Sequence, residues 1–578
     1  MKFITKQQAQ GLRRRLTTLY GEQAPELMDR FFMLLGRYGV GDDVSPHTRF
    51  WGPNDVLLIT YADTISDETG NRNPLQCLHD FCNERLRGAI SIVHLLPFSP
   101  WSSDDGFSVI DYRKVEPSSG DWVDVVNLGE DFNLMFDLVL NHCSKESAWF
   151  RDYVMGVAPG CYYFHPTDPE ADLSKVVRPR PWPLLTEFNS RYGKSHVWTT
   201  FSEDQVDLNW SNPDVLFEFL DILFLYIEKG CRILRLDAIA FLWKEIGTDC
   251  MHRPETHEVV KLFRDVLEIV APDVVLLTET NVPHDENISY FGQGDEAHMV
   301  YNFSLPPLLL HALLRGDTQH LTAWADTLPA LPPGQTFLNF SSSHDGIGVR
   351  PLQGILATDE LMWIANEVKA RGGQVSMRSM PDGSEQPYEL NCSYIDALKI
   401  PDDEGLSMAR FFCSQAVVLA FRGVPAVYIQ NLIGGTNWVE GFEETGRART
   451  LNRRQWKEAE LKAALDENTG SQARIFARYH LWLERRGNHS AFSPDASQVI
   501  RDVGTELFCF VRISPIGGEH IVCLFNFSKK RQTVALSALD ESFEGLKACR
   551  DILSHDTIKT DKKGAITLDP YFAYWLTV

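Results

Sequence analysis

Eight short, nearly continuous apolar runs alternate with helical stretches along most of this chain, and this repeat constrains the fold more than any other feature. A run that is apolar at successive positions is typical of a parallel strand buried on both faces, and the intervening helices supply the crossovers. Eight such units predict an α/β fold, the TIM (β/α)8 barrel, whose functional face lies at the carboxyl ends of the strands. The runs cover residues 56–61, 90–96, 134–140, 231–236, 274–278, 298–303, 336–340 and 424–429.

Several segments depart from this repeat and predict the remaining domain organisation. The amino-terminal segment has helical periodicity and predicts a lead-in to the barrel. A segment rich in Pro and aromatic residues, and a later one rich in Gly, predict inserted lobes near the active site. Alternating polarity near the carboxyl terminus predicts a small antiparallel β domain. The expected boundaries are 1–50 for the lead-in, 51–145, 206–348 and 401–487 for the barrel, 146–205 and 349–400 for the insertions, and 488–578 for the β domain.

Composition and charge limit the classes of partner. The 578 residues carry 55 Lys and Arg against 78 Asp and Glu, and this net charge of −23 disfavours nucleic acid and anionic membrane surfaces. The longest apolar stretch, residues 215–227, contains two acidic residues and is too short to span a bilayer. The amino terminus shows no secretory h-region, and the 11 cysteines lack CxxC spacing, as is typical of reduced core thiols. We therefore expect a cytoplasmic protein that binds neither nucleic acid nor a membrane.

One predicted strand ends in Arg235-Leu236-Asp237, and this ending indicates reactive chemistry. Residues two apart on a strand point to the same face, so Arg235 and Asp237 lie side by side. A neighbouring guanidinium lowers the pKa of a carboxyl group and keeps it ionised, as a nucleophile requires. A buried structural ion pair would have the same sequence, so this short motif alone does not decide between a nucleophile and a structural pair.

Other predicted strands also end in polar residues, and these favour a catalytic rim. The residues are Asp63, Asp137, Asn141, His142, Glu279, Ser343, His344 and Asp345. Converging carboxylates destabilise a fold through repulsion, so they are typical of a functional site. No HxH or HExxH spacing indicates a transition-metal site, and carboxylates from separate strands suit glycosyl transfer as well as they suit a cation. We expect no metal.

The polar strand ends resemble the ordered signature regions of the α-amylase superfamily of glycoside hydrolases. The resemblance rests on four motifs: Asp137 to His142, Arg235-Leu236-Asp237-Ala238, Leu277 to Asn281, and His344-Asp345. Further motifs resemble the sucrose phosphorylase branch, and the match runs from about Asp55 to Arg454; these motifs are Thr60-Tyr61-Ala62-Asp63, Arg178-Pro179-Arg180-Pro181, Ser304-Leu305-Pro306-Pro307 and Leu451-Asn452-Arg453. The resemblance implies a retaining phosphorylase that needs no cofactor and transfers an α-glucosyl unit from a small glucoside to inorganic phosphate.

The resemblance also implies roles for individual residues around the bound glucose. Asp237 would be the nucleophile, Glu279 the acid that protonates the leaving oxygen, and Asp345 the stabiliser of the developing charge. Arg235 would keep Asp237 ionised. The implied glucose-binding residues are His142 and His344 as donors, Gln205 from the inserted lobe, Tyr112 stacked on the ring, and Asp63 with Arg453 clasping the far end of the sugar. Tyr112 departs from the branch, which has His at this position.

Phosphate and the acceptor would bind at the insertions. Arg180 and Tyr388 match the phosphate-binding residues of the branch, and Glu389 follows Tyr388 on the acceptor side. The cations Arg350, Arg371 and Arg378 are nearly balanced by Asp382, Glu385 and Glu389, which favours a neutral acceptor. We therefore expect 2-O-α-D-glucosylglycerol as the substrate of a monomer or homodimer. A glucosylglycerate or sucrose 6-phosphate phosphorylase, or a retaining α-glucosidase or transglucosidase, would carry the same acids.

Overall fold

A computed structural model describes residues 4–38, 50–179, 182–379, 385–467 and 470–578. Its centre is a closed barrel of eight parallel strands in the order β1-β16-β12-β11-β10-β9-β4-β3, as the eight apolar runs predict. Nearly every position on these strands is buried, which explains their continuous apolar character. The strands are β1 (Leu57–Thr60), β3 (Ile92–Leu95), β4 (Asn133–Val139), β9 (Cys231–Asp237), β10 (Val275–Thr278), β11 (Met299–Tyr301), β12 (Thr336–Asn339) and β16 (Val424–Tyr428).

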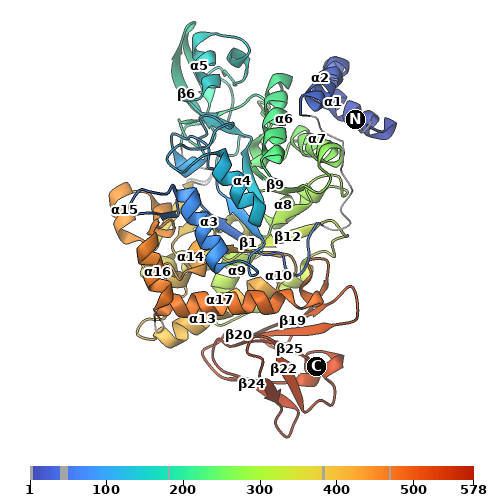
Figure 1. The fold of residues 1–578 in the computed structure, drawn as a ribbon, viewed down its shortest axis with the longest axis vertical. Coiled ribbons are helices and arrows are strands. Elements are labelled where there is room, and N and C mark those ends of the chain that lie inside the picture. Colours follow the sequence, from blue (N-terminus) through green and yellow to red (C-terminus); the bar gives the residue numbers. More distant parts are fainter. Residues whose placement is uncertain (1–3, 39–49, 180–181, 380–384, 468–469) are drawn as a thin grey trace.

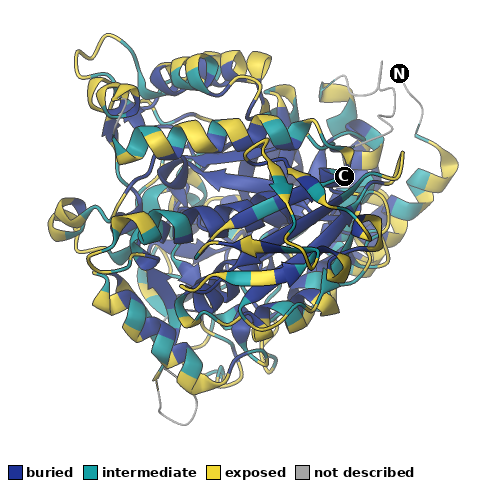
Figure 2. Ribbon diagram, turned by 90° about the horizontal axis from the view of Figure 1, so that it is seen from below, coloured by how far each residue is buried: buried dark blue, intermediate teal, exposed yellow. Residues whose placement is uncertain are grey.

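Helices surround the barrel and cover its strands (Figures 1 and 2). Helix α6 (Pro213–Glu228) is apolar nearly all round because ten of its residues are buried between the barrel and the helices outside it. Asn212 caps its first turn, accepting a hydrogen bond from Asp214 N at 3.0 Å. The other main helices are α3 (Pro74–Arg85), α4 (Trp122–Asp131), α7 (Pro254–Val270), α9 (Leu305–Arg315), α10 (Gln319–Thr327), α13 (Glu404–Ala420), α16 (Glu458–Asp466) and α17 (Ser471–Gly487).

The amino-terminal segment forms two helices, α1 (Lys6–Tyr20) and α2 (Ala24–Tyr38), that lie against the outside of α7 and α6 (Figure 1). The buried Arg15 anchors α1 through ion pairs with Glu258 and Asp265 on α7 and with Asp295. The lead-in therefore packs against the outer helices of the barrel.

Two segments inserted between barrel strands build the surroundings of the site. Between β4 and β9 lie α5 (Ala148–Met155), the hairpin β6 (Leu185–Ser190) and β7 (Gly193–Trp198), and the pair β5 (His142–Ser144) and β8 (Gln205–Asp207). Between β12 and β16 lie α11 (Thr358–Ala370) and a three-stranded sheet in the order β13 (Ile347–Gly348), β15 (Glu385–Asn391) and β14 (Gln374–Ser379). These sheets bring polar residues from distant parts of the chain to the barrel mouth.

The carboxyl-terminal part is an antiparallel sheet in the order β18-β19-β20-β25-β22-β23, which lies below α13 and α17 in Figure 1. Alternation along β19 explains its two apolar faces: Phe508 and Phe510 join the core shared with the barrel, whereas Cys509 and Val511 join a separate small core. The strands are β18 (Ser497–Arg501), β19 (Leu507–Ile513), β20 (His520–Asn526), β25 (Ala573–Thr577), β22 (Ala548–Asp551) and β23 (Thr557–Lys559), with β21 (Gln532–Ala535) and β24 (Ala565–Leu568) paired beside them.

Candidate active site

Three neighbouring barrel strands place the predicted nucleophile and acid side by side. Asp237 is the last residue of β9, and Glu279 follows β10 directly. The amide of Glu279 donates to the Leu236 carbonyl at 3.1 Å and so continues the ladder between these two strands. On the other side of β9, Arg235 lies opposite Asp137 of β4 in the parallel register. Parallel pairing therefore fixes which polar residues meet at the carboxyl end of the barrel.

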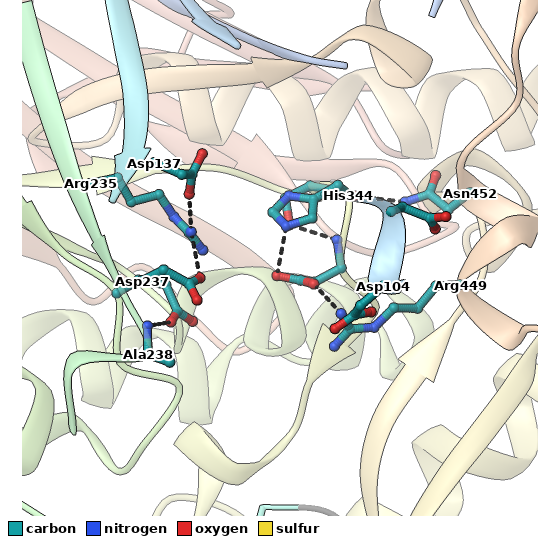
Figure 3. A network of polar contacts seen from close by, with 12 residues as sticks. Asp104, Asp137, Arg235, Asp237, Ala238, His344, Arg449 and Asn452 are labelled. Carbon is teal, nitrogen blue, oxygen red and sulfur yellow. Dashed lines mark hydrogen bonds and ion pairs between the residues drawn. The ribbon is translucent and has the colours of Figure 1, made fainter. Parts of the chain in front are cut away.

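Arg235 bridges two buried carboxylates (Figure 3). Its Nη1 donates to Asp137 and, at 2.7 Å, to Asp237 Oδ1. Asp137 also bonds to His94 Nε2 at 2.5 Å, and although burial favours its neutral form, Arg235 and His94 hold its pKa below the ordinary value. Arg235 therefore compensates two carboxylates at once, which weakens its effect on the pKa of Asp237.

Asp237 and Glu279 are tied together through the intervening backbone. The Ala238 amide donates to Glu279 Oε2 at 3.0 Å, and Ala238 adopts a left-handed conformation with φ +49°. This conformation is uncommon for a residue with a side chain, and here it occurs directly beside the predicted reacting groups.

The pair Asp237 and Glu279 holds one proton more readily than two free carboxyl groups would. Burial raises the pKa of Asp237 to about 8, Arg235 opposes this rise, and the charge of Glu279 adds to it. Burial also raises the pKa of Glu279, and the charge of Asp345 contributes to that rise. Arg235 thus lowers the pKa of Asp237, as expected, but this effect is smaller than the rise caused by burial. Because Arg235 contacts Asp237 directly, we assign the charge to Asp237 and the proton to Glu279.

Asp345 is held ionised by a cation that the sequence analysis did not identify. Arg449 Nη1 lies 2.7 Å from Asp345 Oδ1, and His344 Nε2 lies 3.4 Å from Asp345 Oδ2. Burial alone would raise the pKa of Asp345, but Arg449 and the other nearby positive groups lower it well below its usual range. Burial lowers the pKa of His344 to about 3, so its imidazole is neutral. Neutral His344 can therefore donate one hydrogen bond to a ligand.

Three of the predicted sugar-binding residues lie around a loop that the sequence analysis missed. His142 Nε2 lies 3.1 Å from the Phe107 carbonyl oxygen and 3.2 Å from Gln205 Nε2. The Phe107 ring stacks on His344, with ring centres 5.1 Å apart and planes 6° apart. The structure thus brings His142, Gln205 and His344 together, and it adds Phe107 as an aromatic wall.

Arg453, which is predicted to clasp the far end of the sugar together with Asp63, forms an ion pair with Asp105. Its Nη1 donates to Asp105, whereas Asp63 accepts from Gln455 Nε2 at 2.6 Å. All three residues still line one cavity of about 490 Å³. The loop reaches Arg453 because Gly106 has φ +108°, and a Cβ there would lie 2.5 Å from the Pro97 carbonyl oxygen.

The prediction that Tyr112 stacks on glucose is wrong in this structure. Its hydroxyl lies within hydrogen-bond distance of the carbonyl oxygens of Val139 (2.9 Å) and His142 (2.7 Å). Its ring stacks on Trp149 and meets Phe219 of α6 edge-on. Tyr112 therefore supports the end of β4 from outside the barrel, and Phe107 takes the place next to the acids.

The predicted phosphate and acceptor residues have different outcomes. Arg180 lies outside the described residues. Tyr388 lies in β15 at a bulge, because Ser376 pairs with Glu389 while Met377 pairs with Pro387. Glu389, which is predicted to bind the acceptor, is instead paired with Arg449: both of its carboxylate oxygens accept hydrogen bonds from this residue, at 2.8 and 3.2 Å. Glu389 therefore orients the cation that contacts Asp345.

The predicted balance of charge at the mouth involves fewer groups than expected. Glu389 is neutralised by Arg449, and Arg371 donates to the Glu367 carboxylate (2.8 Å) and the Lys399 carbonyl (3.0 Å). Asp382 lies outside the described residues. One acid and one cation are thereby removed, which leaves Arg350 and Arg378 on one side of the balance and Asp382 and Glu385 on the other.

Comparisons with known proteins agree with this geometry. The catalytic-domain family of alpha-amylases matches residues 89–327. The glucosylglycerate phosphorylase of Spirochaeta thermophila is 44% identical over 90% of both chains, and the glucosylglycerol phosphorylase of Marinobacter adhaerens is 28% identical over 76% of this chain and 88% of its own. The structure of sucrose 6F-phosphate phosphorylase from Thermoanaerobacter thermosaccharolyticum matches with a TM-score of 0.72 and 24% identity, covering 82% of this chain and 94% of that one, and shows the same fold. None of the described helices is long and apolar enough to cross a bilayer.

Proposed function

This chain belongs to the α-amylase superfamily and is a glycoside phosphorylase of the sucrose phosphorylase branch, and we propose that it converts an α-glucosylglycerate and inorganic phosphate to α-D-glucose 1-phosphate and glycerate. Glycerate replaces glycerol as the preferred acceptor because the glucosylglycerate enzyme is a much nearer relative than the glucosylglycerol enzyme.

The observation that carries the proposal is the buried pair Asp237 and Glu279, joined through the Ala238 amide, with Asp345 held by Arg449 nearby. In the first step, Asp237 attacks the anomeric carbon of glucose and the bond from this carbon to glycerate breaks. Glu279 gives its proton to the leaving glycerate oxygen. In adjacent-strand sites of this kind, the two carboxyl groups lie about 5 to 5.5 Å apart, which gives a covalent β-glucosyl-enzyme and retention.

In the second step, a phosphate oxygen attacks the same carbon from the opposite face and Asp237 leaves. Phosphate is already largely ionised at neutral pH, so Glu279 needs to accept at most one proton. Throughout, we assign Asp345 with its partner Arg449 to stabilise the positive charge that develops on the sugar ring. The groups assigned to glucose are His142, His344, Gln205, Asp63, Asp105 and Arg453, with Phe107 beside the ring; Arg180 and Tyr388 remain our candidates for phosphate.

An acceptor screen in the reverse direction tests the proposal. The protein is supplied with α-D-glucose 1-phosphate and, separately, D-glycerate, glycerol, fructose or fructose 6-phosphate, and release of phosphate is measured against a reaction without acceptor. We expect D-glycerate to give the highest kcat/KM. A higher value for glycerol or a fructose would contradict the acceptor. Phosphate release that no acceptor accelerates, with free glucose as the product, would instead indicate the alternative, a retaining hydrolase.

A further inference from the structure

Two arginines of the second insertion lie on the acceptor side of the site, and the mechanism above does not use them. Arg350 lies two residues beyond the end of β13, and Arg378 lies on β14. The middle strand of the sheet, β15, carries Tyr388, whose carbonyl oxygen accepts from Val349 N at 3.1 Å. The sheet thus places both guanidinium groups around the strand that bears the predicted phosphate-binding Tyr388.

Arg350 has a buried but poorly neutralised charge. Its side chain is 12% exposed, and its Nε has no hydrogen-bond partner among the described residues. Its Nη2 lies 3.8 Å from the Met251 sulfur and 3.9 Å from Glu286, which is 43% exposed and also bonds to His252. A long contact to a half-exposed carboxylate gives little compensation for burying a guanidinium.

Arg378 is still less well paired. Its one hydrogen bond within the described part of the chain runs from Nη2 to the neutral amide oxygen of Gln386 at 3.4 Å, and its Nε has no partner there. No described carboxylate lies within ion-pair distance of it. Burial lowers its pKa, and the nearby charge of Arg350 lowers it further. Two guanidinium groups that repel each other in a half-buried site are typical of an anion-binding position.

Contacts of Arg350 place this position beside the catalytic acid. Met251 packs in a small apolar cluster with Ala240 and Val282, three residues beyond Asp237 and Glu279 respectively. Asn281, two residues beyond Glu279, lies against the strand that precedes Arg350: a Cβ on Gly348 would lie 2.4 Å from Asn281 Nδ2. Arg350 therefore lies next to the segments that directly follow both catalytic carboxylates.

We propose that Arg350 and Arg378 bind the carboxylate of the acceptor moiety and thereby select a short hydroxy acid over a neutral polyol. This inference rests on the proposed function. Arg presents its donors in a fork that matches a carboxylate, and the anion would supply the partners that both Nε groups lack. Glycerol in the same place would leave both charges unpaired, which is how a polar site rejects an analogue that lacks the expected group.

The test uses Arg350→Gln, Arg378→Gln and, as a matched control, Arg371→Gln, which removes an arginine of the same insertion that is already paired with Glu367. Each protein is measured with α-D-glucose 1-phosphate as donor and with glycerate or glycerol as acceptor. Hydrolysis without acceptor reports whether the acids remain intact. We expect each of the first two variants to lower kcat/KM for glycerate by about 10- to 100-fold, mainly through KM, the size expected for a lost charge-assisted hydrogen bond. Values for glycerol and for hydrolysis stay within about twofold, and the control does not change.

Three results would overturn the proposal. Equal losses of kcat/KM for glycerate and glycerol would show that the two arginines only stabilise the structure of the insertion. An increase in the KM for phosphate in the forward direction, with the KM for glycerate unchanged, would assign them to phosphate. Unchanged glycerate kinetics in the double variant would show that another group binds the carboxylate. A wild-type enzyme that prefers glycerol would instead refute the proposed function itself, so the two failures are distinguishable.

Discussion

The guanidinium of Arg449 lies 2.7 Å from the Asp345 carboxylate and holds this acid ionised in a buried site. Since Asp345 stays charged, its field raises the pKa of Glu279, the proton donor. The geometry thus assigns opposite protonation states to two acids that lie close together.

Arg449→Gln is expected to lower kcat/KM for the glucoside by about 100-fold, the loss typical of one electrostatic stabiliser of a transition state. Without the cation, the pKa of Asp345 rises towards that of an uncompensated buried acid, so the acidic limb of the pH profile moves to higher pH. The pH dependence of kcat/KM for both proteins measures this shift. Arg474→Gln, which removes an exposed ion pair with Glu404, is the control. An unchanged acidic limb would exclude the assigned role of Arg449.

The proton shared by Asp237 and Glu279 predicts that activity declines on the alkaline side of the pH profile. Burial raises the pKa values of both Asp237 and Glu279, so the pair keeps its proton to a higher pH than ordinary carboxyl groups do. Once this proton is lost, no acid remains for the leaving glycerate oxygen, so activity on the glucoside should fall at alkaline pH. α-D-Glucosyl fluoride needs little protonation on leaving and should show a much weaker decline. Parallel declines for the two donors would contradict this account.

The ion pair of Arg453 with Asp105 predicts that Asp105 matters more for glucose binding than Asp63. Asp105→Asn removes the charge that positions Arg453, whereas Asp63→Asn leaves a side chain that can still bond to Gln455. We expect the KM for α-D-glucose 1-phosphate to rise about tenfold or more in the first variant and about threefold or less in the second. The opposite order would show that Asp63 contributes more to glucose binding than Asp105 does.

We expect Tyr112 to contribute to the stability of the fold and not to sugar binding. Tyr112→Phe loses the hydroxyl contacts to Val139 and His142, at a cost of about 1 kcal/mol in the free energy of unfolding. Denaturant unfolding measures this loss, and the KM for α-D-glucose 1-phosphate should not change. Phe107→Leu, the comparison variant, should raise this KM because Phe107 stacks on His344 beside the acids. A changed KM in Tyr112→Phe would reinstate the stacking role.

The sequence predicts the barrel and its acids well because both depend on local patterns. Each strand is buried on both faces and is therefore a continuous apolar run, and Asp237 and Glu279 occupy or directly follow the last positions of such runs. The alternating strands after the barrel are predicted for the same reason, since β19 divides its side chains between two cores.

Contacts between residues that lie far apart in the sequence could not be predicted from local patterns. Asp104, Asp105 and Gly106 have φ of +55°, +49° and +108° in succession, and this conformation, which no apolar periodicity reveals, presents Asp105 to Arg453. The pairing of Glu389 with Arg449 joins residues 60 positions apart. The acidic pair before Gly106, and a second arginine four residues before Arg453, were the available signals for these contacts.

Covalent attachment of glucose to Asp237 is the central claim, and trapping it is the most direct test. In Glu279→Gln the acid is absent, so α-D-glucosyl fluoride can load the enzyme while turnover through poor nucleophiles is slow. Mass spectrometry of the intact protein and of its proteolytic peptides is then read with and without added phosphate. The account predicts one anhydroglucose unit on the peptide that contains Asp237, and its release as α-D-glucose 1-phosphate when phosphate is added. A peptide map without the adduct, or with the sugar on another residue, would contradict it.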